Sequence, residues 1–304
     1  MHEAAQVAQV TQVKHALPGT LGTSTNPDDL EVIGEGFSSL ILAAGDTVFR
    51  VPRHREAADR QAAVVRVLPE LQRLLPVHIS APTVSVPASA TLPFGAVAFE
   101  RLPGIPMRSG YAGPSIAGAL GRLLAALHAI RPHHLSIPVR GRAGVDRARH
   151  VAMDAALAFL RETLSAPDYV HIVRWWASYR GFRRLPLPTP ALVHGDLWYG
   201  NILVDPGHTR ILGLLDWEEM AFDDPAQDFA TLRHSGNAFS DDALAAYAHA
   251  GGAIDVGLLA RREWHWECRE VIGIASAIKT GDTAEIEETL DKLMSGPVMR
   301  SRRR

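Results

Sequence analysis

One acidic segment in the second half of the chain constrains the fold more than any other stretch. Residues 201–205 and 211–215 are largely apolar runs separated by a Pro-Gly turn, a pattern that predicts two strands joined as a hairpin. Asp196 and Asn201 lie at the start of the first strand, and Asp216 directly follows the second. Because a hairpin returns the chain to where it began, we expect these three polar side chains to meet at one edge.

These three side chains suit the chemistry of a hard cation. One carboxylate is free to act as a base, whereas an amide and a second carboxylate offer oxygen ligands. Mg²⁺ prefers such oxygen ligands, keeps several waters and is completed by substrate phosphates. The alternative interpretation is an acidic hairpin in an ordinary α/β enzyme, with carboxylates that are merely solvated. A lone His-Gly-Asp would favour that alternative, but the joint spacing of the whole segment does not.

The same segment resembles a known family at two places. The residues HGDLWYGN, which begin at His194, resemble the HGDxxxxN catalytic loop of the aminoglycoside and macrolide antibiotic phosphotransferase family, relatives of the protein kinases. The run LLDWEEMAFDDPAQDFA, residues 214–230, resembles the IDWxxxxxxDPxxDxA segment of that family. The first Asp of that segment, here Asp216, corresponds to the metal-binding Asp of the kinase DFG motif.

The resemblance implies a role for each polar residue of the segment. Asp196 would orient the acceptor hydroxyl and accept its proton. Asn201 and Asp216 would hold Mg²⁺, and His194 and Asp228 would support the catalytic loop by hydrogen bonds.

The resemblance also implies an α+β fold of the protein-kinase type with two lobes. Residues 1–103 would form a small, β-rich nucleotide-binding lobe, and residues 104–304 a larger, mostly helical lobe that binds the substrate and carries the catalytic residues. A chain of 304 residues is long enough for two lobes and a sizeable core.

Composition excludes several other classes of protein. The net charge of −2 gives no overall field that would attract nucleic acid or an anionic membrane. Cys268 is the single cysteine, so no internal disulfide can form, which agrees with a reducing cytoplasm. No apolar run approaches the roughly 18 residues of a membrane span. We therefore expect a cytoplasmic protein without a nucleic-acid, membrane or evident protein partner.

A glycine-containing hairpin near the start of the chain is the predicted phosphate-binding loop. Residues 30–33 and 40–44 read as strands on either side of it. Glycine carries no side chain that would keep phosphate oxygens away from backbone N–H groups. The loop precedes the His-Gly-Asp motif as the nucleotide-positioning loop does in the family. The predicted nucleotide-binding residues of this loop are Gly34, Gly36, Ser38 and Ser39.

A cation on the third strand completes the predicted phosphate site. Residues 47–53 read as that strand, and Arg50 takes the position where the family carries a Lys or Arg that contacts the nucleotide. The following helix, residues 56–75, has Gln61 where a Glu usually pairs with that cation. The partner of Arg50 is therefore open, and Glu56 is the nearest alternative.

A second strand-to-loop boundary resembles the hinge of the family. The strand 94–99 is followed by a Pro-Gly pair at 103–104, which predicts a lobe boundary. The resemblance implies that the Glu100 carbonyl and the Leu102 N–H meet the nucleobase and that Phe99 lies behind it. A bulky residue at the position of Phe99 is associated with a preference for GTP in some relatives, so both ATP and GTP stay open as donors.

The second half of the chain is predicted to be mainly helical. Ser115 is expected to cap a helix, residues 131–150 read as a loop, and residues 256–279 read as a long helix. Along this last helix three carboxylates fall on one face, and Trp residues flank them. With two carboxylates that follow the metal Asp, they form the predicted acceptor-binding set of Glu218, Glu219, Glu263, Trp264, Glu267 and Glu270.

The predicted function is transfer of the γ-phosphoryl group of ATP or GTP to a hydroxyl of a small molecule. The concentration of carboxylates favours a cationic antibiotic, an aminoglycoside first and a macrolide second. Two other classes stay open: a metabolite kinase of the choline, homoserine or sugar type, and a catalytically silent nucleotide-binding module. The silent module is suggested by Gln61 and opposed by the intact Asp196, Asn201 and Asp216.

Overall fold

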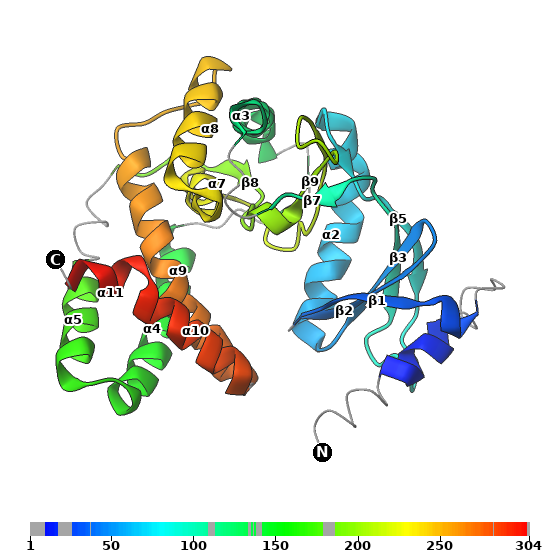
Figure 1. The fold of residues 1–304 in the computed structure, drawn as a ribbon, viewed down its shortest axis with the longest axis horizontal. Helices are drawn as coiled ribbons and strands as arrows, with labels where there is room; N and C mark the ends of the chain where they lie inside the picture. The colour runs from blue at the N-terminus through cyan, green and yellow to red at the C-terminus, as the bar shows by residue number, and fades with distance from the viewer. Residues whose placement is uncertain are drawn as a thin grey trace.

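The chain folds into a small β-rich lobe and a larger helical lobe (Figure 1). The structure, a computed structural model, describes residues 10–17, 26–36, 38–108, 113–132, 135, 137, 142–178, 186–281 and 283–302, with backbone alone for 142–148 and 280.

The small lobe is built on a five-stranded antiparallel sheet in the order β1-β2-β3-β6-β5. A short 3-10 turn, η1 (Pro27–Asp29), leads into it. One sheet face buries an apolar cluster that includes Leu42 and Phe49, together with Leu17 from helical residues 10–17. The strands are β1 (Glu31–Glu35), β2 (Ser39–Ala44), β3 (Thr47–Pro52), β5 (Pro82–Val86) and β6 (Ala96–Glu100).

One long helix, α2 (Arg55–Leu74), lies beside this sheet and borders the large lobe (Figure 1). Its apolar residues repeat at helical spacing, and the ring nitrogen of His54 accepts a hydrogen bond from the Ala57 N–H at its start. Val64 and Leu68 join the core of the large lobe, so α2 ties the two lobes together.

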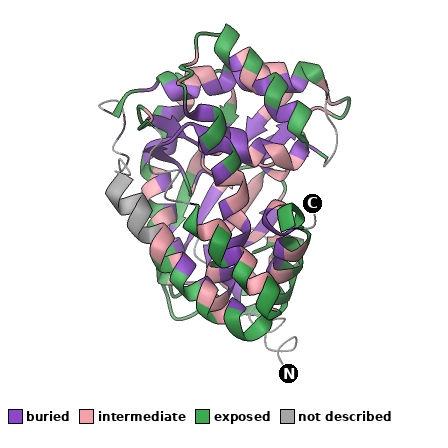
Figure 2. Cartoon of the chain, turned by 90° about the vertical axis from the view of Figure 1, so that its left-hand side faces the viewer, coloured by how far each residue is buried: buried purple, intermediate pink, exposed green. Residues whose placement is uncertain are grey.

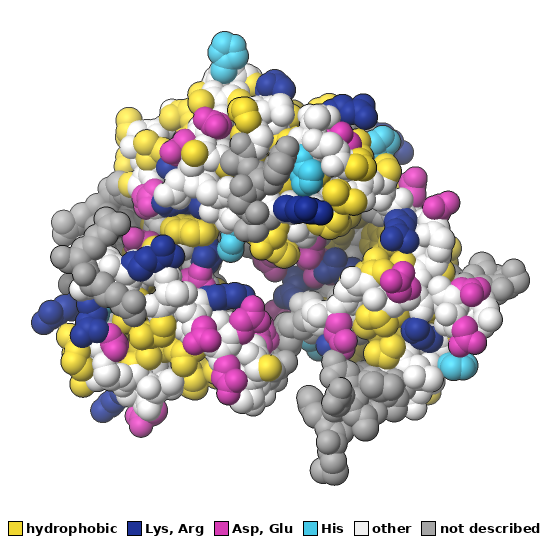
Figure 3. Space-filling model, in the orientation of Figure 1, with side chains coloured by type: hydrophobic (Ala, Val, Ile, Leu, Met, Phe, Trp, Pro, Cys, Tyr) yellow, Lys and Arg dark blue, Asp and Glu magenta, His cyan; other side chains and the backbone are white. Residues whose placement is uncertain are grey.

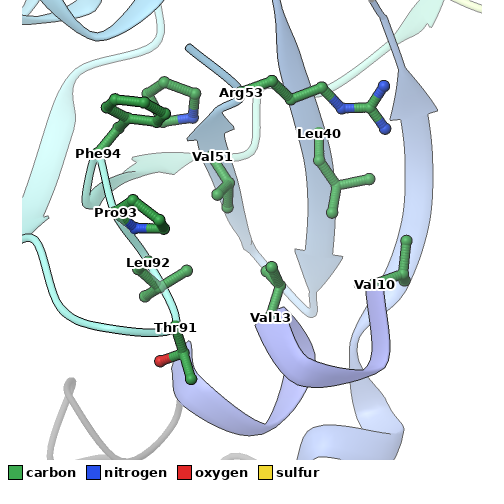
Figure 4. A pocket seen from close by; sticks show the side chains of 10 residues that line it. Val10, Val13, Leu40, Val51, Arg53, Thr91, Leu92, Pro93 and Phe94 are labelled. Atoms are coloured by element: carbon green, nitrogen blue, oxygen red, sulfur yellow. The ribbon is translucent and has the colours of Figure 1, made fainter. Parts of the chain in front are cut away.

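A cavity of ≈ 70 Å³ lies in the small lobe, between the sheet and helical residues 10–17 (Figure 4). Val13, Leu40, Val51 and Leu92 line it, and all four belong to the apolar cluster of this lobe. The cavity is a packing gap in that cluster and contains none of the residues predicted for the active site.

Two small sheets carry the acidic segment. The first has the strand order β4-β10-β9-β7, and in it β9 and β10 pair antiparallel, as the hairpin pattern predicts. The second pairs β8 with β11. These strands are β4 (His78–Ile79), β7 (Ile105–Pro106), β8 (Ala191–Val193), β9 (Ile202–Val204), β10 (Ile211–Leu214) and β11 (Ala221–Asp223).

Helices surround these sheets and bury the core of the large lobe (Figure 2). No helix among the described residues is long and apolar enough to cross a membrane. The helices are α3 (Pro114–Ala129), α4 (Arg142–Thr163), α5 (Ala166–Ala177), α7 (Ala226–Thr231), α8 (Asn237–His249), α9 (Leu258–Thr280), α10 (Thr283–Ser295) and α11 (Pro297–Arg302), with 3-10 turns η3 (Tyr199–Asn201) and η4 (Leu232–Ser235).

Several boundaries differ from the sequence prediction, most by one or two residues, and three of the differences have a clear local description. Ser115 does not cap α3, because Gly113 is the N-cap and Pro114, with its fixed φ, opens the helix. The predicted loop 131–150 contains the first turns of α4, which begins at Arg142. The strand expected to begin at Phe94 begins two residues later, after Gly95 with φ 70°.

We propose that the two lobes divide after residue 103. β7 begins at Ile105 and already pairs with β9 of the large lobe, whereas β6 ends at Glu100 in the sheet of the small lobe.

Candidate active site

Asp196 and Asn201 are joined directly in the turn that precedes β9. The Asn201 Nδ2 group donates to the backbone oxygen of Asp196 at 2.8 Å and to its Oδ2 at 3.1 Å. Asn201 is buried at the end of η3, and both bonds come from its Nδ2 group. Because the Nδ2 group faces Asp196, the amide oxygen points away from that carboxylate.

Asp228 supports the loop that carries Asp196. This fully buried carboxylate accepts hydrogen bonds from the backbone N–H groups of His194, at 3.0 Å, and Gly195, at 2.9 Å. Its Oδ2 also lies 3.1 Å from Nε2 of His128 on α3. Burial alone would raise the pKa of Asp228, but these partners outweigh burial and hold the pKa below its usual value.

His194 joins the catalytic loop to the strand end that precedes Asp216. Its Nε2 lies 2.9 Å from the Leu215 carbonyl oxygen, and its Nδ1 accepts from the Asp196 N–H at 3.3 Å. Complete burial lowers the pKa of His194 despite the negative charge of Asp228. The ring is therefore neutral with its proton on Nε2, the one tautomer that satisfies both bonds.

A glycine is needed between these two residues for two reasons. Gly195 has φ 85°, in the left-handed region, and a Cβ there would lie 2.6 Å from the Glu219 carbonyl oxygen. The close approach brings the residues that follow Asp216 against the catalytic loop.

Asp216 lies at the end of β10 in a conformation uncommon for a side chain. Its φ is 61°, which few non-glycine residues adopt. The backbone before it is fixed by the bond from the Leu215 N–H to the Asn201 carbonyl oxygen, at 2.9 Å. Its carboxylate is 37% exposed and lies 3.3 Å from Nη2 of Arg50 in the small lobe. The structure therefore brings together Asp196, Asn201, Asp216 and Arg50.

Asp196 titrates abnormally in this setting. Burial, followed by the negative charges of Asp216 and Glu219, raises its pKa to about 6, and the Asn201 hydrogen bond opposes the shift. At neutral pH the group is mostly a carboxylate and is a stronger base than an ordinary aspartate.

The glycine loop lies against the same arginine. The Gly36 N–H donates to the Ser39 carbonyl oxygen at 3.0 Å, and Gly34 packs against the side chain of Ile41. Arg50 Nε lies 3.4 Å from Ser39 Oγ, whereas Ser38 Oγ accepts from Arg60 Nη2 at 3.2 Å. Residue 37 lies outside the described residues.

The predicted hinge residues lie where β6 leaves the small lobe. Phe99 packs against the core of the large lobe. The Glu100 carbonyl oxygen, which is predicted to meet the nucleobase, accepts a hydrogen bond from Ser80 Oγ at 2.5 Å. Leu102 is buried in the space that Gly213 leaves, because a Cβ at Gly213 would lie 2.7 Å from its Cδ1.

Residues 29–265 of the chain match the phosphotransferase enzyme family. The chain belongs to this family. Over 79 residues it is 37% identical to viomycin phosphotransferase of Streptomyces vinaceus, a match to 25% of this chain and 26% of that protein. Over 237 residues it is 27% identical to acyl-CoA dehydrogenase family member 10 of Mus musculus, a match to 70% of this chain and 21% of that protein. The chain thus spans about a quarter or less of the length of these curated relatives.

Solved structures of antibiotic phosphotransferases share the fold. The GDP and kanamycin complex of APH(2")-IIIa has a TM-score of 0.80 at 20% identity, with 93% of this chain and 97% of that chain covered. The macrolide 2'-phosphotransferase MphH from Brachybacterium faecium has a TM-score of 0.67 at 25% identity, with 92% and 96% covered. The predicted kinase-like, two-lobe α+β fold is confirmed, and the chain belongs to a family of phosphotransferases.

The predicted acceptor residues of this phosphotransferase do not form one acidic face. On α9, Glu263 pairs with Arg233 at 2.6 Å, and Glu270 is buried against Arg269. Glu267 Oε2 accepts from Trp175 Nε1 at 2.8 Å. Each carboxylate on this helix therefore has a partner within the protein, which the spacing of charges along α9 could not reveal.

The other three residues predicted to bind the acceptor lie in different surroundings. Trp264 is buried and stacks on Trp175 with ring centroids 5.1 Å apart. Glu218 lies 2.9 Å from Arg50, the residue predicted to bind phosphate, so its carboxylate already has a partner in the small lobe. Glu219 is exposed, and its charge reaches Asp196. Figure 3 shows the molecule hollowed between the lobes, with acidic and basic side chains beside the opening.

Two residues that contact the site were not predicted for it. Arg60 reaches Ser38 and Glu218 from α2, and its position four residues after Glu56 was the available signal. His128 on α3 contacts Asp228 and lies 3.2 Å from the Tyr247 hydroxyl. Its signal was a polar ring on an otherwise apolar helix.

The donor set fits Mg²⁺ that arrives with a nucleotide. Among the described residues no group of three or more His, Cys, Asp or Glu side chains is arranged to hold a metal ion. The site offers instead the partly exposed carboxylate of Asp216 and the oriented amide oxygen of Asn201. Two hard oxygen ligands with open positions suit an ion that is completed by waters and phosphate oxygens.

Proposed function

We propose that this phosphotransferase moves the γ-phosphoryl group of ATP or GTP to a hydroxyl group of a small molecule. The observation that carries the proposal is the meeting of Asp196, Asn201, Asp216 and Arg50 at the boundary of the two lobes. Together they supply a base, two oxygen ligands and a cation, the set that phosphoryl transfer needs.

The chemical step requires little covalent work from the protein. The acceptor oxygen forms a bond to the γ-phosphorus while its proton passes to the Asp196 carboxylate. The bond between the γ-phosphorus and the bridging oxygen breaks, and a nucleoside diphosphate leaves. Asn201 holds the carboxylate that receives the proton, so the contribution of the chain is position and charge.

Asn201 and Asp216 would hold Mg²⁺, which neutralises phosphate charge when it is bound. The Arg50 guanidinium, with its planar fork, would contact phosphate oxygens beside the loop residues Gly34, Gly36, Ser38 and Ser39.

The donor base would lie against Phe99, Glu100 and Leu102. Both donors are kept, because one structural relative is described as a GDP complex and another, an aminoglycoside phosphotransferase, as ADP-bound.

The acceptor that we propose first is an aminoglycoside. Glu219 supports it, since this exposed carboxylate lies beside the catalytic loop, where it would attract an amino group near the attacked hydroxyl. A macrolide is the second candidate. Trp175, which is partly exposed and stacks on the buried Trp264, offers apolar surface at the large lobe, and MphH is 25% identical to this chain.

A panel of acceptors tests the proposal directly. The purified protein is incubated with Mg²⁺ and either ATP or GTP, together with aminoglycosides, macrolides, viomycin, choline, homoserine and sugars. We expect release of the nucleoside diphosphate and a phosphorylated product with one antibiotic class. Asp196→Asn serves as the inactive control. Turnover with choline, homoserine or a sugar alone would replace the antibiotic assignment, and no turnover with any acceptor would favour a silent module.

A further inference from the structure

Helix α2 supplies no charged partner for Arg50. The residue that faces this strand is Gln61, which is 3% exposed and donates from Nε2 to the Arg50 backbone oxygen at 3.2 Å. This bond fixes the strand and leaves the guanidinium untouched. Glu56, the other candidate on the helix, pairs with Arg60 and Lys279 instead. The carboxylate that orients Arg50 must therefore come from another element.

The large lobe provides that carboxylate. Glu218 follows Asp216 by two residues, and its Oε1 lies 2.9 Å from Arg50 Nε. Its side chain is 8% exposed, so the pair is shielded from water and stronger than a surface ion pair. Asp216 contacts a different edge of the same guanidinium, Nη2, at 3.3 Å. One arginine is thus held by two carboxylates at separate edges of its fork.

Arg60 extends this arrangement to the glycine loop. Its Nη2 donates to Ser38 Oγ at 3.2 Å, and its Nε lies 4.0 Å from Glu218 Oε2. Glu218 therefore lies between two arginines, one on β3 and one on α2. The three side chains form a bridge from the end of the catalytic segment to the loop predicted to bind phosphates.

We propose that Glu218 is the positioning residue for Arg50 and that Arg60 couples it to the glycine loop. Glu218 lies at the Nε edge as an ion-pair partner, while the Nε–H itself is directed to Ser39 Oγ. The charge of Glu218 keeps the guanidinium in this orientation, so that the Nη edge is left for phosphate oxygens once Asp216 turns to the metal. This inference rests on the proposed function, and it assigns to the large lobe a task that a helix carboxylate performs when residue 61 is Glu. Without Glu218, Arg50 keeps Asp216 as its carboxylate partner and competes with the metal for it.

A double-mutant cycle in nucleotide binding tests the assignment. The dissociation constants of Mg·ADP and Mg·GDP are measured by calorimetry for the wild type, Arg50→Ala, Glu218→Gln and the double variant. We expect each single variant to weaken binding of the preferred diphosphate about tenfold, the scale of a lost charge-assisted hydrogen bond. In the Arg50→Ala background, Glu218→Gln should change the constant less than twofold, because Glu218 acts through Arg50.

Arg60→Met should weaken binding about threefold through the loop, and the exposed residues of the same helix provide matched controls. Arg66→Met and Glu70→Gln remove charge from α2 without touching the bridge, so we expect wild-type affinity for both. Thermal melting of every variant separates loss of the fold from loss of orientation.

Three results would overturn the inference. Equal weakening by Glu218→Gln in both backgrounds would assign it a general structural role. Tighter binding would mean that Glu218 merely repels phosphate, and unchanged binding would remove it from the site. The proposed function is checked separately by Asp216→Ala, which should abolish Mg²⁺-dependent diphosphate binding. If wild-type protein binds no nucleotide, the proposed function and the inference both fail.

Discussion

The two walls of the cleft are held by different forces. On the large-lobe wall, Asp228 and His194 are fully buried, and short hydrogen bonds fix the loop that carries Asp196. On the small-lobe wall, Arg50 and Arg60 are partly exposed, and ion pairs hold them.

The difference follows from what each wall has to do. A general base must stay within hydrogen-bond distance of one proton, and buried, fully paired hydrogen bonds provide such rigidity. If Arg50 binds phosphate, as we propose, it exchanges protein carboxylates for phosphate oxygens in every cycle. Ion pairs permit that exchange, because phosphate oxygens can replace the carboxylates as partners of the guanidinium.

The largest effect is expected where the rigid wall is broken. Asp228→Ala leaves the buried N–H groups of His194 and Gly195 and the ring of His128 without their acceptor. We expect a loss of roughly 3 kcal/mol or more in the free energy of unfolding, measured with urea. Arg50→Ala, on the other wall, should cost less, because Asp216 is 37% exposed and Glu218 still faces Arg60. Equal losses for the two variants would contradict the comparison.

Asp196→Asn should separate activity from stability on the same wall. Turnover should fall by about two orders of magnitude or more, because the positioned base is lost. Burial raises the pKa of Asp196 to about 6 in the folded protein, above the value of about 4 expected for an unfolded aspartate. The carboxyl group therefore costs no stability below about pH 4, lowers stability as the pH rises from about 4 to 6, and keeps its full cost above pH 6. Asn carries no charge, and the melting temperature at pH 7 should rise by about 2 °C or more. A lower melting temperature would mean that the carboxylate stabilises the fold.

The catalytic segment could be predicted from sequence because its geometry is local. Asp196 and Asn201 are five residues apart in one turn, and the β9–β10 hairpin returns the chain to Asp216. A few backbone bonds within this segment fix the distances between these three side chains. The spacing of the residues in the sequence therefore predicts the geometry. The assignment of its residues to base and metal ligands stays a prediction.

The acceptor side could not be predicted because its contacts are distant in sequence. The carboxylate spacing along α9 is correct, but it does not reveal that Arg233 reaches Glu263 or that Trp175 donates to Glu267. The pairing of Glu218 with Arg50 was not predicted for the same reason, since Arg50 lies on a strand 168 residues earlier. The spacing of charged residues predicts which residues share a helix face, but it does not predict which side chains from other elements pack on that face.

A moderate effect is expected at Glu219, an exposed residue whose backbone contacts the catalytic loop at Gly195. Glu219→Gln should raise the KM for a cationic acceptor about threefold at low salt and reduce its dependence on salt, because exposed charges are screened within about 10 Å at 0.1 M. Glu267→Gln is the matched comparison, since its carboxylate accepts from Trp175 Nε1. Its KM should change less than that of Glu219→Gln. A larger KM change for Glu267→Gln than for Glu219→Gln would mean that the acceptor binds along α9.

The smallest effect is expected at an exposed ion pair between α9 of the large lobe and α2 of the small lobe. Lys279 on α9 lies 2.6 Å from Glu56 on α2, with side chains 70% and 55% exposed. Such a pair contributes about 0–1 kcal/mol, since water and salt screen it and two long side chains lose freedom. Lys279→Ala should therefore change unfolding free energy by less than about 0.5 kcal/mol and leave nucleotide affinity within twofold. A larger effect on affinity than that of Arg60→Met would mean that Lys279 governs the approach of the two walls, and that the small-lobe wall is fixed from α9.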